Sequence, residues 1–358
     1  MPGPLNPLAS LRHELGVALH RRMRDEAEAA IAAARPQLLA DAAAAAGATG
    51  EVAPAAVADA PGVPVGDLDG RRAPGEVAAE LGLPPAVDLE TEVGRLYAHR
   101  DDLVITPELE QLGRWQGDEP EHIVAALTSG DAVIDVGANI GYMTLAAAGT
   151  IGPSGHVLAI EPDSANAALL AANVRRNGLN DRVTVINAAA WSFPGVVELS
   201  LATENTGDHR VDAELRERAS VRVPAVCLDD VADPARRVRL IKLDTQGTEH
   251  VVLRGARALL ARDRPTILLE FWPTEIRRRG DDPAEVLRGY RAHGYAISVI
   301  DEPSVDAASD QPIIDAMDRR PAPCGGFGTL RLDPVAPTHE RTPRPASELP
   351  DGPPVRKA

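Results

Sequence analysis

A chain of 358 residues, 44% of them apolar, is long enough to bury a large core in one or two domains. Its formal net charge of −16 argues against the broad basic surface that nucleic acid or anionic lipid requires. Its cysteines, Cys227 and Cys324, form no Cys-x-x-Cys pattern, which argues against a disulfide framework and a structural zinc site. We therefore expect a globular cytoplasmic protein with no nucleic-acid partner, no metal and no membrane association.

The N-terminal part of the chain differs in composition from the rest. Residues 10–35 and 37–46 predict two helices separated by Pro36, and glycine, proline and alanine dominate from there to Pro74. The last residues are rich in proline, which predicts a disordered tail. The predicted parts are a helical extension with its linker over 1–74, a folded domain over 75–333 and the tail over 334–358.

The central part alternates predicted strands and helices, which is typical of an α/β domain with a parallel sheet. The predicted strands of the sheet are 133–136, 156–160, 183–187, 238–243, 266–271, 295–300 and 326–332. The predicted helices are 76–81, 120–127, 142–148, 164–177, 248–260 and 283–292. We also expect a short strand at 103–105 and a hairpin arm at 196–201. Because 301–325 lacks a convincing long helix, the last strand is predicted to return antiparallel.

The segment from Val133 to Gly141 predicts a buried strand that ends in a ligand-binding turn. Gly137 and Gly141 can adopt positive φ, and the next helix exposes its N-terminal amides to the turn. The dinucleotide pattern G-x-G-x-x-G is incomplete, which argues against a bound pyrophosphate. The turn therefore suits a nucleoside cofactor, and the alternative is a plain strand-to-helix turn of an α/β protein.

Acidic residues follow other predicted strands at the same edge of the sheet. Glu161 follows the second strand, where a carboxylate accepts hydrogen bonds from ribose hydroxyls, or alternatively caps the next helix. Asp244 and Glu270 end the fourth and fifth strands, where they suit a cofactor ammonium group or a substrate hydroxyl. Lys242 shares a strand face with Asp244 and is expected to pair with a carboxylate.

Several sequence blocks occur in a fixed order, namely Asp135-Val136-Gly137-Ala138-Asn139-Ile140-Gly141, Glu161-Pro162, Asn205 with Gly207-Asp208-His209-Arg210, Leu228-Asp229-Asp230, and Ile241-Lys242-Leu243-Asp244 with Gly247 and Glu249. With these blocks, residues 87–332 resemble the FkbM family of S-adenosylmethionine-dependent methyltransferases. The resemblance implies a Rossmann-like, seven-stranded, mostly parallel sheet with an antiparallel last strand and the cofactor at its carboxyl edge. It also implies O-methylation of a sugar, a polyketide or another secondary metabolite. One departure is Thr245-Gln246, where the family often has Val-Glu before the glycine.

The expected site follows from these blocks. The cofactor-binding candidates are Asp135, Gly137, Ala138, Asn139, Gly141, Glu161 and Asn187, and the catalytic candidates are His209, Asp244 and Glu270. Methyl transfer to a hydroxyl requires alignment of the two groups and removal of the hydroxyl proton. His209 lies in the polar loop 203–210 and titrates near neutrality, which favours it as the base, with Asp208 or Asp244 orienting it. Asp244 is the competing base, and a surface-loop histidine is the alternative for His209.

Three other functions fit parts of the pattern. A catalytically silent nucleotide-binding or regulatory module would keep the fold without turnover, but the intact acids argue against it. A nucleic-acid base methyltransferase would resemble enzymes with Asp or Asn, two prolines and an aromatic residue in place of residues 244–247. A hydride-transferring dehydrogenase is the third. The favoured partner is a small-molecule or glycan hydroxyl acceptor, with S-adenosylmethionine as the cofactor.

Overall fold

The computed structural model describes residues 85–115, 117–211, 218–320 and 326–335. The helices predicted at 10–35, 37–46 and 76–81, the linker to Pro74 and the tail from residue 336 onward lie outside the described residues. No described helix is both long and apolar enough to cross a membrane.

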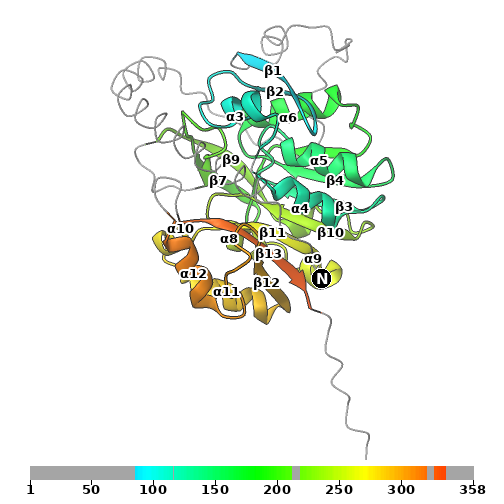
Figure 1. Ribbon diagram of the computed structural model, residues 1–358. Coiled ribbons are helices and arrows are strands. Elements are labelled where there is room, and N and C mark those ends of the chain that lie inside the picture. Colours follow the sequence, from blue (N-terminus) through cyan, green and yellow to red (C-terminus); the bar gives the residue numbers. More distant parts are fainter. Residues whose placement is uncertain (1–84, 116, 212–217, 321–325, 336–358) are drawn as a thin grey trace, which may run out of the picture. The chain divides into compact units, whose positions relative to one another are not determined.

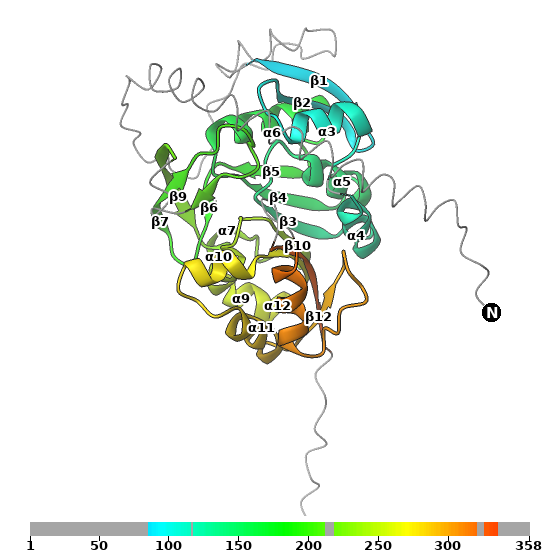
Figure 2. The same ribbon diagram turned by 60° about the vertical axis from the view of Figure 1, so that its left-hand side comes forward.

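The centre of the fold is a seven-stranded sheet with the order β12-β13-β11-β10-β3-β4-β5, and Figure 2 shows β5, β4, β3 and β10 in succession. Its strands are β3 (Ala132–Val136), β4 (His156–Ile160), β5 (Val183–Ile186), β10 (Val238–Leu243), β11 (Thr266–Phe271), β12 (Tyr295–Val299) and β13 (Gly328–Pro334). Each strand overlaps one predicted from the sequence. The Rossmann-like fold with a mostly parallel sheet is confirmed.

Strand β13, the last in the chain, lies between β11 and β12 and not at an edge of the sheet. It pairs antiparallel with both β11 and β12, so the prediction of an antiparallel last strand is confirmed. Its insertion between these two strands was not predicted. The connection from β12 to β13 also contains the helix α12 (Asp310–Asp318), in a region for which no long helix was predicted.

Helices cover both faces of the sheet because alternate residues of each buried strand point to opposite sides (Figure 1). On β3, Val133 belongs to the apolar core of one face and Ile134 to that of the other. The first core includes residues of α3 (Ile105–Leu112), α4 (Glu119–Ala126), α5 (Tyr142–Ile151) and α6 (Ser164–Arg176). The second includes residues of α7 (Leu228–Val231), α8 (Glu249–Arg254), α9 (Arg257–Asp263), α10 (Pro273–Arg278), α11 (Pro283–Ala292) and α12.

Two local predictions were wrong. The expected strand at 103–105 is absent, because Ile105 begins α3 and the carboxylate of Asp102 accepts from the first free N–H groups of that helix. The single helix expected at 248–260 is broken into α8 and α9 around Gly255. A Cβ at Gly255 would lie 2.3 Å from the carbonyl oxygen of Trp191, so the break allows a close approach of two backbones.

Two smaller strand groups flank the central sheet. A hairpin of β1 (Ala86–Thr91) and β2 (Gly94–His99) packs on α6, where the Asn173 side chain bonds both the N–H and the carbonyl of Tyr97. A four-stranded sheet has the order β6-β9-β7-β8. Its strands are β6 (Ala189–Ala190), β7 (Gly195–Ser200), β8 (Arg210–Val211) and β9 (Ser220–Val226). Of these strands, only β7 was predicted, as the hairpin arm.

Candidate active site

The turn after β3 brings the backbone of the expected cofactor site against the end of β10. Gly137 has φ of 72° and Gly141 has φ of 99°, so both adopt the left-handed conformations expected of them. The N–H groups of Gly137 and Ala138 both donate to the carbonyl of Ile160 at the end of β4. A Cβ on Gly137 would lie 1.9 Å from the carbonyl oxygen of Asp244. The close packing therefore requires glycine at this position.

Replacing Gly137 with alanine is expected to destabilise the fold. The overlap with the Asp244 carbonyl should cost about 1 to 3 kcal/mol, and the left-handed backbone roughly 1 kcal/mol more. Chemical denaturation would measure the loss. Gly149→Ala in α5 is the matched control, because nothing lies within 4 Å of its Cβ position and alanine favours a helix. Equal stability of the two variants would contradict the proposed steric role of Gly137.

Glu161 connects the turn that follows β3 to the turn that follows β4. Its Oε2 accepts from the N–H of Asn139 at 2.8 Å, and its Oε1 accepts from the N–H of Asp163 at 2.9 Å. Burial raises the pKa of Glu161 to about 8, although both N–H groups favour the charged carboxylate. The side chain of Asn187 donates to the carbonyls of Glu161 and Pro162. Asn187 therefore holds the backbone of the turn that presents Glu161.

Lys242 is a buried cation between the buried Asp135 and the half-buried Asp244. Its Nζ lies 3.3 Å from Oδ2 of Asp244 and 4.0 Å from Oδ1 of Asp135, which is the adjacent residue on β3. Burial lowers the pKa of Lys242, but Asp244, Asp135 and Glu119 raise it more strongly, so the net shift is upward. Thr144 donates to the other oxygen of Asp135 at 2.6 Å. Lys242 therefore stays charged and holds the acids at the end of the sheet in place.

Asp244 and Glu270 lie side by side but in different environments. Leu243 pairs with Leu269, and the two acids are the next residues on the parallel strands. Oδ2 of Asp244 contacts Lys242, and its Oδ1 accepts from the side chain of Gln246 at 2.7 Å. Oε2 of Glu270 is buried without a hydrogen-bond partner among the described residues. Burial, followed by the charges of Asp244 and Glu249, raises the pKa of Glu270 well above its ordinary value.

The polar loop after β7 is anchored to residues far away in the sequence. Oδ2 of Asp102 accepts from both the N–H and the hydroxyl of Thr206, while its Oδ1 binds the start of α3. The side chain of Asn166, in α6, donates to the carbonyl of Thr206. A Cβ on Gly207 would lie 3.2 Å from Nδ2 of Asn139. The loop therefore packs against the turn that follows β3.

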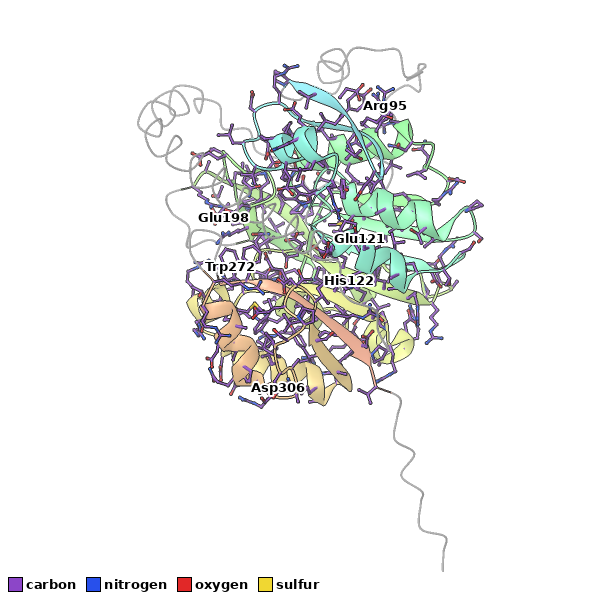
Figure 3. The ribbon with its side chains drawn as sticks, in the orientation of Figure 1. Arg95, Glu121, His122, Glu198, Trp272 and Asp306 are labelled. Atoms are coloured by element: carbon purple, nitrogen blue, oxygen red, sulfur yellow. The ribbon has the colours of Figure 1, made fainter. Side chains whose placement is uncertain are left out.

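Arg210 connects this loop to the end of β11. It pairs with Asp208 at 2.7 Å and with Glu275 at 3.2 Å, and its guanidinium lies 4.6 Å from the ring centre of Trp272. Trp272 is labelled in Figure 3 and directly precedes α10. Arg210 is also the charge that lowers the pKa of Glu270. Gly207 thus packs against Asn139, and Arg210 holds the loop to Trp272 and Glu275, which follow β11.

The structure groups the expected residues into two sets. One set lies on or directly after the neighbouring strands β3, β10 and β11, namely Asp135, Asp244 and Glu270. The other set, Glu161 and Asn187, directly follows β4 and β5 and lies beside the first turn. His209 lies in the loop, where Asp163 and Asp208 are the acids that act most strongly on it.

Sequence reasoning missed residues that lie far from the motifs in the chain. Glu119 begins α4 and faces this cluster, and burial, offset by Lys242, raises its pKa to about 7. Its only sequence signal was an acid at a predicted helix start. Asp102 and Trp272 carried no signal, because their roles depend on partners distant in the sequence.

Comparison with protein families identifies the domain. Residues 135–297 match the family model described as the methyltransferase FkbM domain. Residues 135–297 therefore form an FkbM methyltransferase domain. The match begins at Asp135 and ends at Ile297 in β12, so it contains both glycine turns and the three strand-end acids. The family expected from the sequence is therefore confirmed. Among curated proteins, none matches this chain.

Three solved structures that resemble the FkbM domain are distant from it in sequence. Methyltransferase FkbM from Methylobacillus flagellatus is 19% identical over 57% of this chain and 44% of that chain, with a TM-score of 0.38. The chain therefore spans less than half the length of that protein. An S-adenosylmethionine-dependent O-methyltransferase from Thermotoga maritima is 13% identical over 70% and 86% of the two chains, with a TM-score of 0.35. A tRNA m1G37 methyltransferase from M. jannaschii is 11% identical over 70% and 55%, with a TM-score of 0.38.

Proposed function

We propose that the protein transfers a methyl group from S-adenosylmethionine to a hydroxyl of a sugar, a polyketide or another secondary metabolite. Membership of the FkbM family supports methyl transfer. The observation that carries the choice of a hydroxyl is Glu270, a poorly solvated carboxylate without a hydrogen-bond partner among the described residues, one strand away from Asp244. A weakly acidic hydroxyl needs such a base, because it does not ionise by itself at neutral pH.

The residues of the two turns fit a nucleoside cofactor. Gly137 and Gly141 let the backbone approach a ligand, and the Oδ1 atom of Asn139 is buried without a partner among the described residues. Glu161 offers carboxylate lone pairs to ribose hydroxyls beside its two backbone bonds. Bound S-adenosylmethionine supplies an electrophilic methyl group on a sulfonium. The chain's own part is to hold the hydroxyl in line with it and to accept the proton.

The three catalytic candidates differ in their ability to accept that proton. Both oxygens of Asp244 are already engaged, by Lys242 and Gln246. The Nδ1 atom of His209 accepts from the N–H of Ala202, which occupies its lone pair. Glu270 has no such partner among the described residues, and its raised pKa makes the ionised form a stronger base. We therefore favour Glu270 as the base, with Asp244 and Lys242 fixing the adjacent strand end.

Binding of S-adenosylmethionine is expected to release a proton at neutral pH. The pKa of Glu161 is about 8 in the free protein, so much of its carboxyl is protonated at pH 7. Donation by ribose hydroxyls favours the carboxylate and lowers that pKa, so affinity should rise as the pH rises toward 8. Calorimetry in two buffers with different heats of ionisation measures the proton. Glu161→Ala should also weaken binding by about 1 to 3 kcal/mol.

Glu161→Gln is the control for this proton, because it keeps the shape of the side chain and cannot ionise. Its binding heats should be the same in both buffers. A wild-type protein that binds without any buffer dependence would remove Glu161 from the ribose position.

Methyl transfer itself is tested with S-adenosylmethionine that carries a labelled methyl group. The full chain would be incubated with a panel of sugars and hydroxylated polyketides, and products would be identified by mass spectrometry. Label on an acceptor oxygen supports the proposal. Binding of S-adenosylmethionine without transfer to any hydroxyl would favour the catalytically silent module, and binding of NAD alone would favour a dehydrogenase.

A further inference from the structure

The hydrogen bond to His209 determines which ring nitrogen carries its proton. The N–H of Ala202 donates to Nδ1 of His209 at 3.0 Å, so Nδ1 must present a lone pair. In a neutral imidazole the proton then lies on Nε2. Burial lowers the pKa of His209, which favours the neutral ring. The side chain therefore offers an Nε2–H donor, which is the opposite of the proton acceptor that the sequence suggested.

The position of His209 places this donor near the cofactor turns. Asp163 exerts the strongest charge effect on the ring, and this residue lies two positions after Glu161 and caps α6. Gly207 in the same loop packs against Asn139. The side chain of Asn166 donates to the carbonyl of Thr206 in that loop, and the N–H of Asn166 donates to Asp163. The loop that carries His209 therefore lies beside the turn that follows Glu161.

The Nε2 atom has capacity for a ligand. Within the part of the chain that the structure describes, no group forms a hydrogen bond with Nε2 of His209, and this atom is not among the fully buried unpaired ones. The loop that carries the ring is held by Thr206 on Asp102 and by Arg210 on Glu275. A donor on a loop fixed at both ends is pre-organised for a ligand oxygen.

We infer that Nε2–H of His209 donates a hydrogen bond to a ribose oxygen of the bound nucleoside cofactor. This rests on the proposed function, because it requires the nucleoside to occupy the turns at Asn139 and Glu161. A ribose hydroxyl that donates a hydrogen bond to Glu161 keeps lone pairs, which can accept a hydrogen bond from His209. The two side chains thus bind the same sugar in complementary ways, Glu161 as the acceptor and His209 as the donor.

Three substitutions separate a donor from a loop anchor. In His209→Gln the amide nitrogen takes the place of Nε2 and keeps the donor. In His209→Asn the amide oxygen takes the place of Nδ1 and keeps the bond to the N–H of Ala202. His209→Ala loses both interactions. Calorimetry with S-adenosylhomocysteine should give near wild-type affinity for His209→Gln and roughly 2- to 12-fold weaker binding for the other two. A pure anchor would give the reverse order, with His209→Asn close to wild type. Equal affinity of all three variants would also overturn the inference.

A second measurement does not depend on an acceptor. Nitrogen NMR of the wild-type chain labelled at histidine reports which ring nitrogen of His209 is protonated, and the signal missing from His209→Gln assigns it. We expect the proton on Nε2 in the free protein and a changed Nε2 signal after S-adenosylhomocysteine is added. A proton on Nδ1 would overturn the inference. A wild-type protein that does not bind S-adenosylhomocysteine would instead refute the proposed function, while the tautomer would still be measured.

Discussion

Replacing Glu270 with glutamine is expected to lower methyl transfer by roughly 10²- to 10⁴-fold, with the affinity for S-adenosylmethionine nearly unchanged. Glutamine keeps the size of the side chain but cannot accept the hydroxyl proton. The carboxylate of Glu270 lacks a hydrogen-bond partner among the described residues, so the substitution removes no hydrogen bond there and, besides the proton acceptor, only the charge that attracts Arg210. Initial rates at saturating cofactor and acceptor would measure the change, and calorimetry would measure the affinity.

The pH dependence gives an independent check on Glu270. Burial and the neighbouring acids raise its pKa well above the ordinary value of 4.5. Because only the ionised form accepts a proton, wild-type turnover should rise with pH through this raised pKa, and the rise should be absent in Glu270→Gln. Asp244→Asn is the matched control at the adjacent strand end. A larger loss of turnover in Asp244→Asn than in Glu270→Gln would assign the base to Asp244.

Replacing Lys242 with methionine is expected to reduce the free energy of unfolding by about 3 to 5 kcal/mol. Methionine fills much of the space, but it leaves Asp135 and Asp244 without the cation that lies 4.0 Å and 3.3 Å from their oxygens. A carboxylate that is shielded from water is costly to keep charged without an opposite charge beside it. Denaturant unfolding near pH 7 would measure the loss.

The pH dependence of that loss distinguishes charge from packing. Burial already raises the pKa of Asp135 and Lys242 lowers it, so removal of the lysine should raise it further. A pKa raised in the folded state lowers stability as the pH rises through it, so the loss in Lys242→Met should be larger at pH 8 than near pH 4. Arg288→Met breaks an exposed pair with Asp282 at 3.7 Å and should cost less than about 1 kcal/mol. A loss in Lys242→Met that does not change with pH would indicate packing alone.

The central sheet was predictable because its strands are buried on both faces. Such strands appear as short, nearly continuous apolar runs, as in Ala132–Val136 and Thr266–Phe271. Of the strands that were missed, β6 and β8 have two residues each, and β9 alternates Val, Arg, Val and Pro without a clear apolar run. The position of β13 was hidden because a sequence does not show between which strands a returning strand inserts.

The site was predictable in position and less so in chemistry. Acids that directly follow parallel strands must meet at one edge, so Asp244 and Glu270 could be placed together from the sequence alone. The role of each acid depends on partners that the sequence does not specify. Gln246 engages Asp244, and Ala202 engages His209, so two of the three candidate bases already accept hydrogen bonds. The hydrogen bond from Thr206 to Asp102 joins residues 104 positions apart, and no feature of the sequence indicated it.

That contact links the start of α3 to the loop that carries His209. One carboxylate, Asp102, receives the first N–H groups of α3 on one oxygen and Thr206 on the other. Closing a loop of this length has an entropic cost that is recovered only when both ends are structured. Any state in which Thr206 is released from Asp102 would have a cofactor turn without the fixed His209 donor, so full affinity for the ligand depends on this distant contact.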